Sequence, residues 1–200
     1  MKAVLIGASP DAFWDRRWVP DLVLCADGGL LRTAELGLVP DLVIGDRDSG
    51  GEGGSAPAVI LPAEKSMTDM DACLDRALTL GAEEIALLGA TGGRLDHTLC
   101  NLGLLERAKG KAYILDSSHE VYLLAKPIKR RPPHPYRYFS VLPLDEEISG
   151  VTITGGKYPL VNALLRRDAS VGVSNEPLPD TEFTVSVDFG NALLILSERS

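Results

Sequence analysis

The stretch EIALLGATGGRLDHTLCNLGLL, residues 84–105, contains the three pieces from which the fold is built. It opens with a short apolar run, turns at a group of glycines, and continues with leucines at helical spacing. The opening run is too short and too apolar for an amphipathic helix, and it therefore predicts a buried strand of a parallel sheet. Strand, turn and helix in this order are the repeating unit of an α/β fold.

The same alternation extends over residues 1–118, which we predict to form an α/β domain with a largely parallel sheet and crossover helices. Further buried strands are predicted at residues 2–7, 22–27, 41–46 and 112–116. A helix is predicted over residues 69–80, where Met70, Cys73, Leu74, Ala77 and Leu78 share one face. The next helix follows Arg94, and its predicted apolar face consists of Leu95, Leu99, Leu102 and Leu105.

The pattern changes after residue 118, which predicts a second domain over residues 119–200. The segment 126–137 is proline-rich and basic, and it predicts an exposed loop. Short β-rich runs separated by Gly, Pro and Asn follow it, and they are typical of a small antiparallel sandwich or barrel. These runs are residues 137–144, 151–156, 170–175, 183–190 and 192–198, whereas residues 160–167 are expected to form one or two helical turns.

Composition narrows the class of protein. A chain of 200 residues with 45% apolar and 24% charged residues is ordinary for a globular protein of one large or two small domains. Its net charge of −8 argues against binding to nucleic acid, which requires a basic surface. No apolar run approaches the roughly 18 residues of a membrane span. The three cysteines are predicted to be buried free thiols of a cytoplasmic protein.

Acidic residues follow several of the predicted strands, at the edge where open α/β sheets bind their ligands. Asp27 follows the second strand, Asp46 and Asp48 follow the third, and Asp69 opens the helix at 69–80. Carboxylates gathered in this way repel one another unless a cation is bound. Mg²⁺ prefers a few carboxylates together with substrate phosphates, so the edge predicts a site for a metal and a nucleotide.

Each acidic group also has a purely structural interpretation. Asp27 can cap a turn between strand and helix, and the pair Asp46 and Asp48 can belong to a solvated turn. Thr68 can be the N-cap of the helix at 69–80, with Asp71 at the third helical position. The functional interpretation therefore depends on the convergence of these groups at one edge.

The glycine turn at 89–93 resembles a phosphate-binding loop without its lysine. Gly92 and Gly93 permit close approach of the backbone to a ligand, and the helix that follows offers free N–H groups. Arg94 supplies a planar fork that suits phosphate oxygens. Asp96 suits the helix dipole, and His97 is expected to be a neutral hydrogen-bond partner of a ligand.

Four segments of the chain together resemble the thiamin pyrophosphokinases. They are ADGGLLRTAELGLVPDLVIGDRDS (26–49), TDMDACLDRAL (68–78), GATGGRLDHTLCNLGLL (89–105), and GGKYPLVNALL (155–165) with GVSNE (172–176). The resemblance implies a Rossmann-like N-terminal α/β domain that binds ATP and Mg²⁺, and a C-terminal β-sandwich that binds thiamine and forms the dimer. It also implies a homodimer with active sites between subunits, and transfer of a pyrophosphoryl group from ATP to thiamine, with AMP as the second product.

The resemblance also implies roles for individual residues. Mg²⁺ would be held by Asp46, Asp48 and Asp69. The ATP-binding residues would be Asp27, Gly28, Thr91, Gly92, Gly93, Arg94 and His97. The catalytic residues would be Asp46, Asp48, Asp69, Asp71 and Asp96, and Asp71 or Asp69 is our candidate for the group that accepts the alcohol proton. Thiamine would contact Thr68, Ser174 and Asn175.

Three features depart from the family pattern. Residues 65–67, directly before Thr68, are Lys, Ser and Met, whereas family members often have an additional acidic residue there. Arg47 stands between the two carboxylates of GDRDS, where the family often has a large apolar residue, and the basic segment 126–137 has no counterpart. Two other functions remain open at this point. One is a related pyrophosphokinase that acts on another alcohol, such as a hydroxymethyl pterin, and the other is a regulator that binds nucleotide or thiamine without catalysis.

Overall fold

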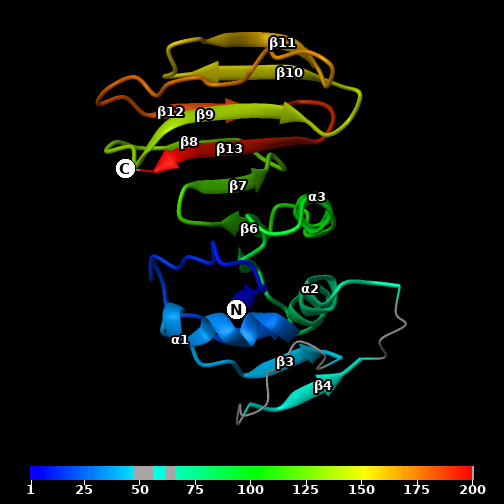
Figure 1. The fold of residues 1–200 in the computed structure, drawn as a ribbon. Helices are drawn as coiled ribbons and strands as arrows, with labels where there is room; N and C mark the ends of the chain where they lie inside the picture. Colours follow the sequence, from blue (N-terminus) through cyan, green and yellow to red (C-terminus); the bar gives the residue numbers. More distant parts are fainter. Residues whose placement is uncertain (47–55, 62–65, 200) are drawn as a thin grey trace. The chain divides into compact units, whose positions relative to one another are not determined.

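The computed structural model describes residues 1–46, 56–61 and 66–199, which fall into two compact units, Met1–Ser117 and Ser118–Ser200 (Figure 1). The division lies next to the change of sequence pattern at residue 118. Arg47 and Asp48 lie outside the described residues, so the predicted role of Asp48 as a metal ligand stays a prediction. The two units are described separately below.

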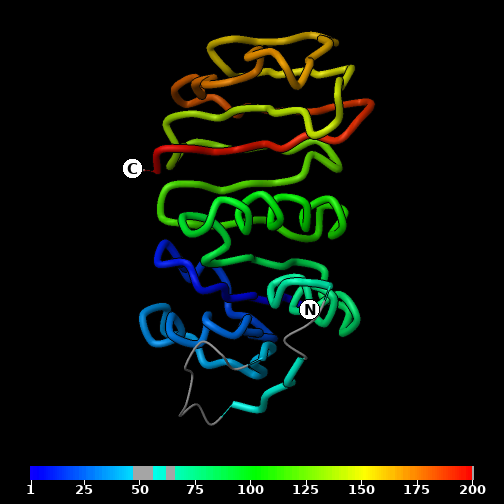
Figure 2. Tube along the Cα trace, turned by 45° about the vertical axis from the view of Figure 1, so that its right-hand side comes forward, coloured from blue at the N-terminus to red at the C-terminus, as the bar shows by residue number. Residues whose placement is uncertain are grey.

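The first unit contains a parallel sheet whose strand order is β4-β3-β2-β1-β5-β6. Its strands are β1 (Lys2–Ile6), β2 (Leu22–Ala26), β3 (Leu42–Gly45), β4 (Ala58–Ile60), β5 (Glu84–Leu88) and β6 (Ala112–Leu115). Five were predicted because buried parallel strands are continuous apolar runs. The short edge strand β4 was not predicted, and Figure 2 shows it at the edge of this unit's sheet.

Short helical segments and two longer helices connect these strands. The 3₁₀-helix η1 (Asp27–Arg32) runs directly into α1 (Thr33–Leu36), which ends at Gly37 in the left-handed region. The longer helices are α2 (Asp69–Thr79) and α3 (Leu95–Arg107), which lie side by side (Figures 1 and 2). Because α2 packs on β1, β2 and β3, it holds its N-terminus close to the edge where those strands end.

The predicted apolar face of α3 is wrong at Leu95 and Leu99, although Leu105 is buried as expected. Leu95 and Leu99 are 72% and 59% exposed, whereas the buried residues of this helix are Asn101, Leu104 and Leu105. The prediction for the cysteines is also wrong at one position, because Cys25 and Cys73 are buried but Cys100, on the same helix, is exposed. The buried face of the helix thus lies toward its C-terminal half and includes a polar side chain, Asn101.

The second unit consists of two antiparallel sheets with a shared core. One contains β7 (His119–Leu123), β13 (Ala192–Arg199) and β9 (Tyr136–Pro143), in that order. The other has the order β11-β10-β12-β8, with β8 (Ile128–Arg130), β10 (Glu147–Thr154), β11 (Leu160–Arg166) and β12 (Phe183–Ser186). Buried side chains of both sheets form one cluster, in which the rings of Phe139 and Phe183 stack with centroids 4.4 Å apart. The predicted β-sandwich is confirmed.

Three local predictions in the second unit are wrong, one of them only in part. The basic segment 126–137 contains a strand, β8, and its last residues begin β9. Residues 160–167 form β11 rather than helical turns, because they pair with β10. Residues 170–175 form turns and bends, with a single bridge between Asn175 and Phe139. Within the described ranges, no helix is long and apolar enough to cross a membrane.

Candidate active site

A pocket of about 340 Å³ opens in the first unit, beyond the carboxyl ends of β1, β2 and β5. It is lined by residues 7–10, 26–28, 68–70, 89–91, 93, 94, 97, 98 and 101. Among them are the predicted site residues Asp27, Gly28, Thr68, Asp69, Thr91, Gly93, Arg94 and His97. The structure thus brings together residues from four segments that are far apart in the sequence.

The position of the pocket follows from the strand order. From β1 the chain builds outward through β2 and β3 to β4, and it then returns to place β5 on the other side of β1. Connections therefore leave the carboxyl ends of β1 and β5 in opposite directions, which opens a crevice between them. Open α/β sheets bind their ligands at such a switch point.

Two glycines allow the loops after β1 and β5 to touch. Gly89 has φ of +60°, and a Cβ atom there would lie 2.6 Å from the carbonyl oxygen of Gly7. A Cβ atom on Gly7 would lie 2.5 Å from the carbonyl oxygen of Gly89. Any larger residue would force the two backbones apart, so this pair determines the floor of the pocket.

Gly92 has a different role from the one expected. It also lies in the left-handed region, with φ of +79°, but a Cβ atom there would meet the carboxylate of Asp11 at 1.8 Å. Gly92 is not among the residues that line the pocket, whereas Gly93 is. The space at Gly92 therefore accommodates Asp11 of the same chain.

Arg94 is paired with Asp96 in this structure. Its Nε donates to Oδ1 of Asp96 at 3.1 Å, and its Nη2 donates to Oδ2 at 2.5 Å. This hydrogen bonding lowers the pKa of Asp96 to about 2, and the same contact raises the pKa of Arg94. Both side chains are largely exposed, so the pair contributes little stability and a phosphate can compete for the guanidinium.

The N-terminus of α2 forms another side of the pocket. Thr68 is the N-cap of α2, and its hydroxyl accepts a hydrogen bond from the backbone N–H of Asp71 at 3.2 Å, so the predicted cap is confirmed. Asp69 lines the pocket, but Asp71 does not, because its carboxylate forms an ion pair with Arg107 of α3. Asp69 is therefore the better placed of the two candidates for contact with a substrate.

Oxygen ligands are present for a hard cation. Asp27, buried at the start of η1, lines the pocket together with Asp69 and the hydroxyl of Thr68. Within residues 1–46, 56–61 and 66–199, no group of three or more His, Cys, Asp or Glu side chains is gathered closely enough to hold a metal. The donors fit Mg²⁺ in kind, since this ion takes oxygen ligands and keeps several waters.

Two side chains of the site were missed by the sequence analysis. Asn101 lines the pocket and donates from Nδ2 to the carbonyl oxygen of Ala90 at 2.8 Å. Asp116, at the carboxyl end of β6, accepts a hydrogen bond from the hydroxyl of Thr91 at 2.6 Å. The signal for Asn101 was its polarity among leucines in TLCNLGLL, and the signal for Asp116 was its position directly after a strand.

The second unit has a pocket of its own, of about 430 Å³. Ser174 and Asn175, both predicted to contact thiamine, line it with Ile153, Tyr158, Leu160 and residues 171–173. The amide of Asn175 is buried, and it accepts from the N–H of Tyr158 at 3.0 Å and donates to the carbonyl of Tyr158 at 2.7 Å. Asn175 thus joins two segments of the pocket wall.

Comparisons with known proteins agree over both units. A family model described as thiamin pyrophosphokinase, catalytic domain, matches residues 14–115, and one described as thiamin pyrophosphokinase, vitamin B1 binding domain, matches residues 127–192. The chain is 33% identical over 168 residues to a thiamine pyrophosphokinase of Bacillus subtilis (strain 168), with 75% of each chain covered.

Solved structures give the same result. A crystal structure of thiamine pyrophosphokinase from Bacillus subtilis has a TM-score of 0.86 and 27% identity, with 98% of both chains covered. One of thiamin pyrophosphokinase from Geobacillus thermodenitrificans also has a TM-score of 0.86, with 31% identity, and covers 100% of this chain and 99% of the other. The similarity therefore extends over nearly the entire chain.

Proposed function

Because this chain belongs to the thiamin pyrophosphokinase family, we propose that it is a thiamine diphosphokinase that converts ATP and thiamine to AMP and thiamine diphosphate. One observation supports the placement of ATP in the first unit. The N-termini of α2 and α3 and the buried Asp27 line a single pocket at the switch point of the sheet. Such a pocket offers donors for phosphate oxygens and carboxylates for the accompanying cation.

The phosphates of ATP would bind at the N-terminus of α3. The first N–H groups of a helix have no partner within it and attract anions. Arg94 stands at this end of α3, and its guanidinium would exchange the carboxylate of Asp96 for phosphate oxygens. His97, in the first turn of the same helix, also lines the pocket and would contact the nucleotide.

Mg²⁺ would be held by Asp46, Asp48 and Asp69, and when bound it would neutralise negative charge on the phosphates. The side chain of Asp69 supports this assignment, because it lies in the same pocket as Arg94 and the start of α3. Asp27 would line the phosphate site beside the metal.

In the reaction, the hydroxyethyl oxygen of thiamine forms a bond to the β-phosphorus of ATP. The bond from that phosphorus to the oxygen bridging to the α-phosphorus breaks, and AMP leaves. The alcohol must lose its proton, and Asp69 is our candidate acceptor because it faces the pocket. Asp71 is a weaker candidate, since its carboxylate is engaged by Arg107.

Thiamine would bind through the second unit, and the active protein would be a homodimer with active sites between subunits. The pocket beside Ser174 and Asn175 supports the first point, because aromatic and aliphatic side chains line it together with polar ones. Val161 and Leu164, exposed on the edge strand β11, support the second. Static light scattering on the purified protein would measure the oligomeric state, and a monomer would contradict the dimer.

Purified protein incubated with ATP, Mg²⁺ and thiamine tests the activity. Thiamine diphosphate and AMP are the expected products in equal amounts, and ADP in place of AMP would reject a diphosphokinase. Turnover of a hydroxymethyl pterin without turnover of thiamine would show that the pterin, and not thiamine, is the acceptor. Binding of ATP without any turnover would indicate a regulator.

Asp69→Asn tests the proposed carboxylate, and Asp75→Asn is its matched control on the exposed side of α2. Asp69→Asn should lose at least about 100-fold in kcat/KM, the scale of a removed acid–base or metal-binding group, with little change in Tm. Asp75 is exposed, and its substitution should leave activity nearly unchanged. Full activity of Asp69→Asn would contradict the assignment.

A further inference from the structure

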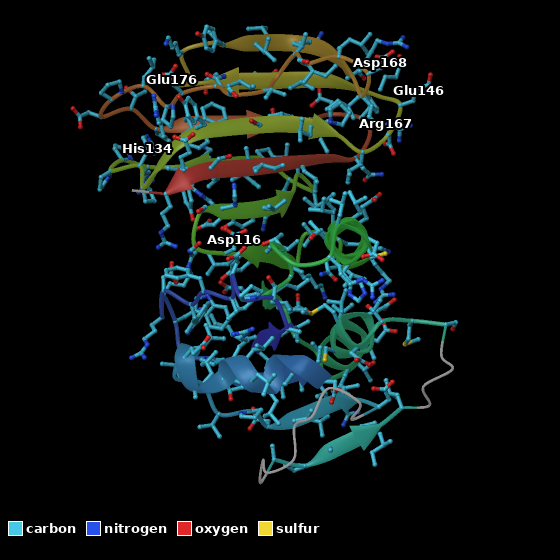
Figure 3. All side chains as sticks on the ribbon, in the orientation of Figure 1. Asp116, His134, Glu146, Arg167, Asp168 and Glu176 are labelled. Atoms are coloured by element: carbon cyan, nitrogen blue, oxygen red, sulfur yellow. The ribbon has the colours of Figure 1, made fainter. Side chains whose placement is uncertain are left out.

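Thr91 lines the pocket, and the proton of its hydroxyl is already engaged in a hydrogen bond within the protein. The residue lines the pocket just after β5, and its hydroxyl donates to Oδ2 of Asp116 at 2.6 Å. Figure 3 shows Asp116 beside β6. Its side chain is only 5% exposed, and it is not among the residues that line the pocket. It therefore acts on a ligand only through Thr91.

The chemistry of a hydroxyl limits what Thr91 can bind. A threonine hydroxyl has one proton and two acceptor lone pairs, and an ionised carboxylate can only accept. Because the proton of Thr91 points to Asp116, its oxygen offers a ligand only lone pairs, and toward an organic ligand it therefore acts as a hydrogen-bond acceptor. A fully ionised phosphate oxygen has no proton to offer, and a buried carboxylate behind the hydroxyl disfavours an anion there.

The surrounding backbone holds Thr91 in this orientation. Nδ2 of Asn101 donates to the carbonyl oxygen of Ala90, the residue before Thr91, at 2.8 Å. Asp116 is itself held by a β-bridge to Ala12, and Gly92, the residue after Thr91, packs against the side chain of Asp11. An oriented and immobile acceptor is the kind of group that selects between similar ligands.

We propose that Thr91, oriented by Asp116, accepts a hydrogen bond from the nucleoside part of ATP and so helps the enzyme to select its nucleotide. The donor is a neutral group, either a ribose hydroxyl or the exocyclic amino group of adenine. Thr91 is then a specificity-determining residue and Asp116 a positioning residue, while the phosphates bind at Arg94. The proposal rests on ATP being the substrate of this pocket.

Isothermal titration calorimetry on the full chain tests the proposal with ATP, 2′-deoxy-ATP, 3′-deoxy-ATP and ITP. Each analogue lacks one candidate donor, so the source of the hydrogen bond is identified by the analogue that binds less well. The wild type should bind that analogue about tenfold more weakly than ATP, the size of one hydrogen bond. Thr91→Val, which lacks the hydroxyl, should bind ATP and that analogue with equal affinity. Thr91→Ser, which keeps the hydroxyl, should retain the difference in affinity between them.

Asp116→Asn tests the positioning role. An amide can donate to the threonine oxygen and turn its proton toward the ligand, so this variant should lose the discrimination although Thr91 is intact. In steady-state assays both Thr91→Val and Asp116→Asn should raise the KM for ATP with kcat little changed. A fall in kcat with unchanged discrimination would show a merely structural role for Asp116.

Thr33→Val is the matched control, because the hydroxyl of Thr33 donates to the carbonyl of Leu30 at 2.8 Å and the residue does not line the pocket. It should discriminate as the wild type does. Equal binding of all four nucleotides by the wild type, or unchanged discrimination in Thr91→Val, would overturn the inference and leave the proposed function intact. Failure of the wild type to bind ATP would overturn both.

Discussion

Asn101 provides a test of how the pocket is held in shape. The side chain is 6% exposed, and its Nδ2 donates to the carbonyl oxygen of Ala90, a residue that is 3% exposed. Asn101→Ala removes the donor and leaves the carbonyl oxygen in a place that solvent hardly reaches. The loop that carries Thr91 begins at this carbonyl, so stability and nucleotide binding should both fall.

The magnitude follows from the cost of an unsatisfied buried group, which is about 1–3 kcal/mol. For a chain of this size, about 1 kcal/mol shifts Tm by roughly 2–4 °C. A loss of about 2 kcal/mol therefore predicts a Tm lower by about 4–8 °C. Asn101→Asp should lower Tm more than Asn101→Ala does, because it turns an acceptor carboxylate toward the carbonyl oxygen.

Thermal unfolding followed by circular dichroism measures the change, and calorimetry with ATP measures the effect on the pocket. Glu106→Ala is the control, since Glu106 is exposed on the same helix and its loss should change stability by less than about 0.5 kcal/mol. If the Tm of Asn101→Ala lay within about 1 °C of the wild-type Tm, the reasoning from the buried carbonyl would be refuted.

Three further predictions concern caps, ion pairs and thiols. Thr68→Ala should lower the free energy of unfolding by about 1 kcal/mol through loss of the N-cap of α2, whereas Thr68→Ser should retain most of it; equal losses in urea titrations would contradict the cap. Because Arg94 lowers the pKa of Asp96 to about 2, the contribution of this carboxylate to stability is present above its unfolded pKa of about 3.9 and is lost as pH falls toward 2. An NMR titration should therefore find the pKa of Asp96 near its ordinary value in Arg94→Ala, and an unchanged value would contradict the pair. Burial raises the pKa of Cys25 to about 12 and also raises that of Cys73, so one thiol, Cys100, should react rapidly with Ellman's reagent in the native protein and all three after denaturation. Rapid reaction of two or more native thiols would contradict the burial.

The local sequence was sufficient to predict much of the fold. Buried parallel strands must be apolar on both faces, so β1, β2, β3, β5 and β6 are recognisable as short continuous runs. The cap of α2 was equally recognisable, because Thr68 and Asp71 interact within a single turn. These features depend on neighbours in the sequence, and they survive any tertiary arrangement.

Contacts with other elements decided the features that were predicted wrongly. The apolar residues of β11 have helical spacing, but the ladder with β10 shifts register between Ile148 and Val151 and again before Ile153, so strict alternation is not required. In α3, the packing of the helix placed Asn101 inside and left Leu95 exposed, because Asn101 has a carbonyl to bind there. In both cases the deciding partner lies outside the element itself: on the preceding strand β10 for β11, and on the loop before the helix for α3.

The same distinction applies to the site. The sequence by itself determined which residue types follow the strands, and since parallel strands end at a common edge, it predicted that Asp27, Asp69 and Arg94 would meet there. Only the tertiary structure decided what each side chain does at that edge. It paired Asp71 with Arg107, turned Arg94 to Asp96, and placed Asp116 behind Thr91. Hydrogen bonds and ion pairs act over a few ångströms, and the distances between these groups are set by how strands and helices pack.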